Sequence, residues 1–385
     1  MNRVSTFLSF LFFPLTLVLG QNSKVDSILT SKDRSKPITN TTSYPKLKIS
    51  GVFQGRFVAS LNENIDINSK YIEPHTGTTN TFMVRFARLQ VKANISDRTE
   101  IFILGNLADS NNKILENASI KYNISPKLAL QLGQFRPWFG LEETFPMDIM
   151  KTLDWSNQYS EFGNLGWTSF QIGASLLGEG KIKSLPFQYA VSIVNGNGRN
   201  QLKDNDDGKL LSSRFSLQVL DKNRLNIGLN GGYGKTFGRN THAIAGDISG
   251  ILKLSRKWEL NFAMEAKQGI NHYLYNNLDP NIRGNLDQYK IKGFYILPDF
   301  RYSFNNNQRN LTAIEFSCRY EYLDQNYDIN SNPRTSLLPM VGLEFLKNYG
   351  ARVQLGAKID RYKNEYKALG INNSNLMILQ VQTRF

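Results

Sequence analysis

Apolar and polar residues alternate along most of the chain from Lys46 to the last residue, in stretches of about 7–11 positions. Clusters of Gly, Asn, Asp, Ser and Pro separate these stretches. Such alternation gives a strand one apolar and one polar face, and helical spacing is scarce apart from a weak candidate over 141–155. The sequence therefore predicts an all-β protein. The clearest expected strands span 86–95, 118–124, 187–194, 212–219, 258–267, 314–322, 351–359 and 377–385.

The first 45 residues differ in character from the rest of the chain. Arg3 precedes a mainly apolar run of 13 residues, which is typical of a cleaved secretory signal peptide. The polar stretch that follows contains little that could fill a core, which predicts a flexible leader. We therefore expect a signal peptide over 1–20, a leader over 21–45 and one folded domain over 46–385.

Several features favour a barrel that crosses a membrane. The expected strands are numerous, and their lengths approach the ~9–11 residues that a tilted strand needs to cross a bilayer. Aromatic residues recur near the strand ends, as interface girdles require. The terminal Phe385 strand resembles the C-terminal signal that the barrel insertion machinery of outer membranes reads. Short turns at 125–126 and 221–223 also alternate with long polar loops at 195–209, 268–290 and 325–336.

The length of the folded domain predicts the number of strands. Its 340 residues would give sixteen strands about 21 residues each, connection included. That spacing suits strands of ~10 residues, whereas eight strands would leave overlong loops and 22 would leave short ones. Bacterial single-chain barrels have an even number of strands, and sixteen can enclose an aqueous channel. We therefore expect a transmembrane antiparallel β-barrel in the outer membrane, reached by export and signal-peptide cleavage.

Composition excludes several other classes of protein. The chain has 46 Lys and Arg against 32 Asp and Glu, which gives a formal net charge of +14. These basic residues are scattered without a zinc-finger or helix-turn-helix pattern, so we expect no nucleic-acid partner. One cysteine and three histidines, without a nucleophile motif such as G-x-S-x-G, argue against a metal site and against an enzyme. No cofactor is expected.

Four short motifs lie in order along the folded domain. They are 132–143 (LGQFRPWFGLEE), 187–198 (FQYAVSIVNGNG), 292–324 and 348–385. Together they resemble the phosphate-selective porin O and P family of Gram-negative outer membranes. The resemblance implies a trimeric, 16-stranded porin in which a long loop folds into the lumen and narrows it. The candidate for that loop is 138–170, which carries five acidic residues and one lysine, a balance of −4.

Basic residues on the polar strand faces would bias the lumen of such a barrel towards anions. Opposite charges on neighbouring strands can instead pair across the wall, and the alternation leaves both interpretations open. We expect a water-filled diffusion channel with a modest preference for anions, with phosphate and other small anionic or polar solutes as candidate substrates. The candidate pore-lining and selectivity residues are Arg85, Arg88, Arg136, Arg214, Arg301, Arg319, Arg352 and Lys358.

Two other interpretations stay open at this stage. One is a plugged or surface-scaffold outer-membrane barrel whose loops at 195–209 and 268–290 bind a partner. The other is a soluble, secreted β-sandwich, because soluble sheets alternate as well. For the channel, the expected partners are its solutes, outer-membrane lipids, the insertion machinery acting on the Phe385 strand and two further copies in a homotrimer.

Overall fold

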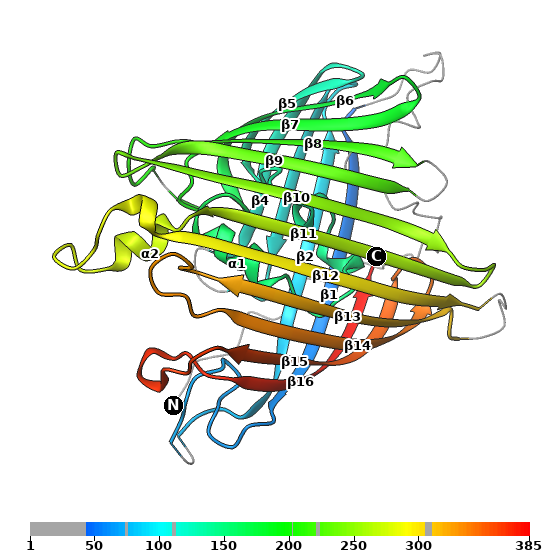
Figure 1. Ribbon diagram of the computed structural model, residues 1–385. Coiled ribbons are helices and arrows are strands. Elements are labelled where there is room, and N and C mark those ends of the chain that lie inside the picture. Colours follow the sequence, from blue (N-terminus) through cyan, green and yellow to red (C-terminus); the bar gives the residue numbers. More distant parts are fainter. Residues whose placement is uncertain (1–43, 74–75, 110–112, 202, 221–223, 305–309) are drawn as a thin grey trace, which may run out of the picture.

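The computed structural model describes residues 44–73, 76–109, 113–201, 203–220, 224–304 and 310–385. The expected signal peptide, nearly all of the leader, and the turn expected at 221–223 lie outside these residues. Sixteen antiparallel strands form one closed barrel, in which each strand pairs with its neighbours in sequence and β1 pairs with β16 (Figure 1). The predicted 16-stranded antiparallel barrel is therefore confirmed, and the two-sheet sandwich is wrong.

The strands match the positions at which the sequence alternates. Among the described residues, no helix is long and apolar enough to span a membrane. The strands are β1 Lys46–Ser60, β2 Asn80–Asn94, β3 Thr99–Asn106, β4 Leu115–Ser125, β5 Leu128–Phe135, β6 Gln171–Ile182, β7 Leu185–Val194, β8 Leu210–Leu220, β9 Leu225–Thr236, β10 Arg239–Lys253, β11 Trp258–Ile270, β12 Lys290–Ser303, β13 Ala313–Asp324, β14 Arg334–Leu346, β15 Ala351–Tyr362 and β16 Ser374–Arg384.

The two faces of each strand have opposite environments, as β13 shows. Glu315 and Arg319 point inward and are each 1% exposed, whereas Phe316 and Tyr320 are 44% and 41% exposed on the outside. A soluble sheet would bury the aromatic face and expose the charged one. An apolar outer face around a polar interior is the arrangement that a barrel needs in lipid.

The last residue of the chain takes part in closing the barrel. The backbone N–H of Gly51 on β1 donates to the carbonyl of Phe385, and the N–H of Phe385 donates to the carbonyl of Gly51, both at 3.1 Å. These bonds extend the β1–β16 ladder to the end of the chain, so that neither strand presents an open edge there. The ring of Phe385 itself is 79% exposed.

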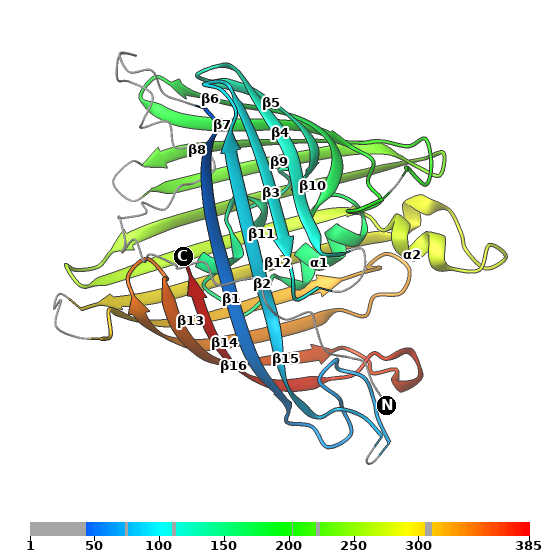
Figure 2. The ribbon, with the colours of Figure 1, turned by 180° about the vertical axis from the view of Figure 1, so that it is seen from behind.

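One long connection, residues 136–170 between β5 and β6, lies inside the ring of strands (Figures 1 and 2). We call it the lumen loop. The weak helical candidate over 141–155 is wrong, because that stretch forms two short 3-10 helices, with extended Pro146 beginning the second one. The one α-helix of the loop begins later. The helices given for the described residues are η2 Glu142–Thr144, η3 Met147–Ile149, α1 Asn157–Asn164, α2 His272–Asn277, η4 Leu286–Gln288 and η5 Lys367–Leu369.

Candidate functional site

The lumen loop packs an apolar core against the inner wall of the barrel. Phe139, Phe162 and Trp167 are at most 1% exposed. Their neighbours in this core include Ala243 on β10 and Ile291 on β12. Helix α1 starts where the Ser156 hydroxyl accepts a hydrogen bond from the N–H of Tyr159, which satisfies one free donor of its first turn. Burial on this scale fixes the loop against the inner wall.

Arg319 on β13 holds the backbone of the loop from the wall side. Its guanidinium donates to the carbonyls of Asp154 (2.8 Å) and Trp155 (2.9 Å) and to the Thr152 hydroxyl (2.9 Å). Its Nε lies 2.7 Å from a carboxylate oxygen of Glu321. The side chain is 1% exposed, so its donors are directed at the loop and at the wall. Arg319 is therefore placed as an anchor of the lumen loop.

Arg352 on β15 anchors a neighbouring stretch of the same loop. It donates to the carbonyls of Met150 (2.9 Å) and Asp148 (3.1 Å) and is 1% exposed. Arg384 on β16 pairs with the Asp148 carboxylate at 2.5 Å. Three wall strands, β13, β15 and β16, thus hold residues 148–155 through arginine side chains.

Asp154 ties the loop to the next two strands of the closed barrel, β1 and β2, which follow β16. Its carboxylate lies 2.9 Å from Arg56 on β1 and 3.2 Å from Arg85 on β2. Burial favours a raised pKa for Asp154, but the charges of Arg56 and Arg85 outweigh burial and hold the pKa below its usual value. The carboxylate is therefore ionised at neutral pH, and the loop is bound to β1 and β2 as well as to β13–β16.

The base of the loop carries a second ion pair, in which the carboxylate is fully buried and the arginine is partly exposed. Arg136 lies 2.5 Å from the Glu143 carboxylate, and it donates to the carbonyls of Glu142 (2.8 Å) and Phe145 (3.1 Å). Burial raises the pKa of Glu143 above its usual value, although the charge of Arg136 opposes this shift. The guanidinium also lies 4.7 Å from the ring centre of Trp155. Arg136 thus shapes the turn at the start of the loop.

Three other predicted residues pair along the wall. Arg214 on β8 forms two bonds of 2.6 and 3.0 Å with Asp247 on β10, both side chains being almost fully buried. Arg301 on β12 bridges Glu315 (2.7 Å) and Glu344 (2.8 Å). Lys358 on β15 lies 3.4 Å from the side-chain oxygen of Asn157 in the loop and 3.9 Å from Asp360. The wall charges therefore pair across strands.

Four arginines stay partly exposed around one region of the lumen. Arg85, Arg88, Arg136 and Arg199 have side-chain exposures of 38%, 15%, 17% and 22%. We call them the arginine rim. Arg88 and Arg199 share the Glu116 carboxylate at 2.8 and 3.4 Å.

Aromatic rings connect the members of the rim. Arg85 and Arg88 lie 4.8 and 4.3 Å from the centre of the Phe86 ring. Arg136 and Arg199 each lie 6.0 Å from the centre of the Phe170 ring. Guanidinium groups on ring faces are held in place without losing their charge. The rim therefore combines fixed positive charge with access to water.

The structure divides the eight sequence candidates. Arg85, Arg88 and Arg136 join the rim, whereas Arg214, Arg319 and Arg352 are buried in pairs and anchors. Arg301 is 12% exposed and bridges two wall carboxylates. Lys358 is 22% exposed, as open as the rim, but it lies against Asn157 of the loop and Asp360 of its own strand. The alternation correctly placed the wall residues on the inner face, but it carried no information on which of them the loop would cover.

Sequence reasoning missed Arg56 and Arg199. Arg56 shares the inner face of β1 with Gln54 and Val58, so the alternation of that strand could have revealed it. Arg199 lies in a loop without periodicity, where no such signal exists. Lys151, the one lysine of residues 138–170, pairs with Glu315 at 3.4 Å. Lys151 of the loop thus meets an acid of the wall, whereas the loop acids Asp148 and Asp154 meet arginines of the wall.

The described residues contain no group of three or more His, Cys, Asp or Glu side chains that could hold a metal ion. Of the three histidines, His75 lies outside the described residues. His272 is buried at the start of α2, where its ring contacts the Thr241 hydroxyl at 3.0 Å, and burial lowers its pKa to about 4. His242 is exposed on β10.

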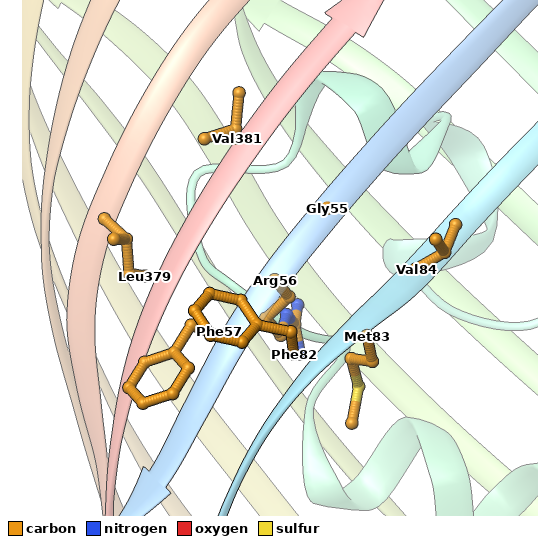
Figure 3. Close-up of a pocket in the computed structure, with 8 residues that line it drawn as sticks. All are labelled: Gly55, Arg56, Phe57, Phe82, Met83, Val84, Leu379 and Val381. Carbon is orange, nitrogen blue, oxygen red and sulfur yellow. The ribbon is translucent and has the colours of Figure 1, made fainter.

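The structure has an inner and an outer hollow. The inner one, of about 170 Å³, separates the lumen loop from β11 and β12. The outer one, of about 380 Å³, lies on β1, β2 and β16, where a register shift follows Gln54 (Figure 3). Figure 3 shows Phe57 and Phe82 on the near side and Arg56 behind β1. The outer hollow therefore belongs to the apolar face and is no part of a pore.

No family model matches the chain, and no curated protein matches it. Solved structures do. A loop-deletion mutant of the outer-membrane protein OmpT of Vibrio cholerae has a TM-score of 0.55 at 12% identity, over 89% of this chain and 99% of that one. The outer-membrane channel DcaP of Acinetobacter baumannii has a TM-score of 0.55 at 14% identity, over 89% of this chain and 97% of that one.

An anion-selective porin from Comamonas acidovorans has a TM-score of 0.53 at 8% identity, over 89% of this chain and 100% of that one. Identities this low show likeness of fold alone, and the phosphate-selective porin O and P family is not established by them. Over its barrel, the chain is similar in fold to outer-membrane porins.

Proposed function

We propose that this protein is a diffusion channel of the outer membrane, with a modest preference for small anions. The observation that carries the proposal is the lumen loop, a segment of 35 residues inside a closed barrel that is bound to its wall by buried arginines. A loop held in this way narrows a barrel and fixes the shape of the remaining passage. The proposal involves no catalytic step.

The preference for anions is attributed to the arginine rim. Pore selectivity depends on charged side chains at the narrow part that remain in contact with water. Arg85 and Arg88 project from β2, and Arg136 and Arg199 from loops on the same side of the lumen. Their carboxylate partners are more deeply buried in two cases, since Glu116 and Glu143 are 4% and 0% exposed. The exposed charge of the rim is therefore mainly positive.

The test is a planar bilayer recording of the purified, folded protein across a chloride gradient. We expect stable conductance steps and a reversal potential on the anion side. Arg88→Gln should shift the reversal potential towards zero, whereas Arg256→Gln, an exposed residue of the β10–β11 turn, should leave it unchanged. Equal reversal potentials in the two variants would remove the rim from the mechanism. Block by added phosphate would identify phosphate as a preferred solute.

A second candidate, the plugged barrel with partner-binding loops, is favoured by one specific observation. The lumen loop makes contact with both β1–β2 and β9–β16, and much of its surface is buried. A barrel whose passage is closed would give no conductance although it migrates as a folded, heat-modifiable species on gels. Silence from such a sample would favour the plugged barrel over the channel.

A homotrimer is part of the proposal. One solved OmpT structure of Vibrio cholerae is described as a trimer form. In this chain the outer hollow collects exposed apolar side chains from three strands at the seam of the barrel, and Phe82 is 83% exposed. An apolar hollow beside protruding aromatic rings suits the packing of a second barrel. Its residues are Phe57, Phe82, Val84, Leu379 and Val381.

A further inference from the structure

The inner hollow has the properties of a ligand site rather than those of a packing defect. Its volume is about 170 Å³, and the lumen loop and the wall each supply part of its lining. Phe145, Ile149 and Met150 come from the loop, and Ala263 and Leu297 come from β11 and β12. Phe145, Ile149 and Ala263 are half-buried, so this apolar lining is reached from the lumen.

One buried polar atom in this lining lacks a hydrogen-bond partner among the described residues. Asp299 on β12 is 0% exposed, and its Oδ2 accepts from the Asn261 side chain at 3.0 Å and lies 3.6 Å from the Lys151 ammonium. Its Oδ1 is buried and has no hydrogen-bond partner among the described residues. Buried carboxylate oxygens are almost always hydrogen-bonded, so we expect a hydrogen-bond donor to bind at this atom.

The charges around the hollow point to an uncharged ligand. Two cations, Lys151 and Arg319, and two anions, Glu142 and Asp299, line it, so they balance. The donors of Arg319 are engaged by Glu321 and by loop carbonyls, as described above. Lys151 is engaged by carboxylates and by the Tyr349 hydroxyl. An anionic ligand would therefore find no free donor here, and a ligand with a hydroxyl group would find the free acceptor.

The size of the hollow limits the ligand to a single small ring or its aliphatic equivalent. A cavity of about 150 Å³ lined by apolar residues binds benzene in another protein. We propose that this hollow binds a small uncharged alcohol of phenolic size, whose hydroxyl donates to Asp299 Oδ1 and whose apolar body packs against Leu297, Phe145 and Ile149. The site adjoins the arginine rim, since Arg136 donates to the carbonyls of Glu142 and Phe145, and it exists whether or not the barrel conducts ions.

The first experiment locates the ligand directly. Crystals of the full-length barrel are soaked in 4-bromophenol at about pH 6, where a phenol is uncharged, and the bromine is found by anomalous scattering. We expect a bromine peak in the hollow, with the phenol oxygen within hydrogen-bond distance of Asp299 Oδ1. The matched probe is 4-bromoanisole, which has nearly the same shape but no donor. Over a concentration series it should bind roughly tenfold or more weakly.

Two variants test the two halves of the site. Asp299→Leu removes the acceptor while it keeps the branched shape of the side chain, and it should abolish the difference between the two probes. Ala263→Phe fills the hollow and should remove the bromine peak for both. The control is Ala266→Phe, on the outer face of the same strand, which should leave binding unchanged. Heat-modifiable migration on gels establishes that each variant is folded.

Each other outcome overturns the proposal. Equal occupancy by the two probes would show that Asp299 does not select a hydroxyl donor. An ordered water on Asp299 Oδ1 that neither probe displaces would make the hollow a hydration site. A bromine peak elsewhere in the lumen, unaffected by Ala263→Phe, would place the ligand outside the hollow. If Asp299→Leu does not fold, the comparison of the two probes on the native barrel and on Ala263→Phe still decides the matter.

Discussion

At the scale of single residues, burial separates the basic side chains of the lumen into two groups. Arg319 and Arg352 have 1% exposure and hydrogen-bond loop carbonyls, whereas Arg85 and Arg88 keep contact with water. A fully paired charge in a dry interior contributes little to the field seen by a passing ion, because its partners cancel it nearby. We therefore assign Arg319 and Arg352 a structural role in holding the loop, and we assign ion selectivity to Arg85 and Arg88.

Arg319→Met is expected to lower stability and leave ion selectivity nearly unchanged. The substitution leaves the buried carboxylate of Glu321 without its 2.7 Å partner, and breaking a buried pair costs about 3–5 kcal/mol. The free energy of unfolding is measured by urea titration in detergent, and the reversal potential by bilayer recording. Arg88→Met is the matched comparison. Glu116 keeps Arg199 as a partner in this variant. Arg88→Met should therefore shift the reversal potential more than Arg319→Met does and lower the stability less, and the opposite order would refute the division into two groups.

At the scale of elements, the lumen loop works as an insert that many strands hold in place. Its acidic residues meet arginines from β1, β2 and β16, and its carbonyls meet arginines from β13 and β15. Its apolar residues form a core that the barrel wall alone does not have. Such a loop is fixed by several independent contacts, so the loss of one contact should loosen it locally.

Asp154→Asn tests the attachment of the loop to β1 and β2. The amide cannot compensate the charge of Arg56, which is 5% exposed, or that of Arg85. We expect a loss of about 3 kcal/mol in stability and larger open-channel current noise, because residues 148–155 lose one of their two sides of support. Asp109→Asn, which removes an acid that pairs with Arg199 outside the loop, is the control. Identical current noise in both variants would exclude a restraining role for Asp154.

His272 makes the β11–β12 connection sensitive to acid. Its pKa is lowered by burial from 6.5 to about 4, so the unfolded segment binds more protons than the folded one between these pH values. The contribution of neutral His272 to the stability of the connection should therefore be fully present above pH 6.5. It should be lost as the pH falls through 4, and the total loss is about 3 kcal/mol. Hydrogen exchange of residues 271–289, corrected for intrinsic rates, measures this loss.

His272→Gln should flatten that pH profile, since glutamine does not titrate. The exposed His242 provides the control, and His242→Gln should keep the profile of the native protein. An unchanged profile in His272→Gln would show that another group causes the acid sensitivity.

At the scale of the whole molecule, the outer hollow predicts how barrels associate. Phe82→Arg places a charge beside the hollow, near the loop end of β2, where arginine on the outer face costs about 0–1 kcal/mol of folding energy. We expect monomers in place of trimers by light scattering in detergent. Tyr233→Arg, at a similar height on β9 and 56% exposed, is the control and should stay trimeric. A trimeric Phe82→Arg barrel would place the interface elsewhere.

The alternation by itself determined the strands, their two faces and the class of fold. Period-two patterning is a local property, and only a closed barrel satisfies the backbone of such strands in lipid. The position of the inner charges on β12, β13 and β15 followed from the same pattern. The strand number followed from length, because the span of a bilayer fixes the length of each strand.

Tertiary structure alone decided what those charges do. Arg319 and Arg88 have the same local pattern, yet the lumen loop covers one and leaves the other partly exposed. The path of the loop depends on contacts between residues far apart in the chain, such as Asp154 with Arg56, 98 positions away, which no local period encodes. The hollow beside Asp299 likewise exists only because loop and wall meet there. The sequence therefore determines the barrel, and the packing of its interior determines the candidate sites.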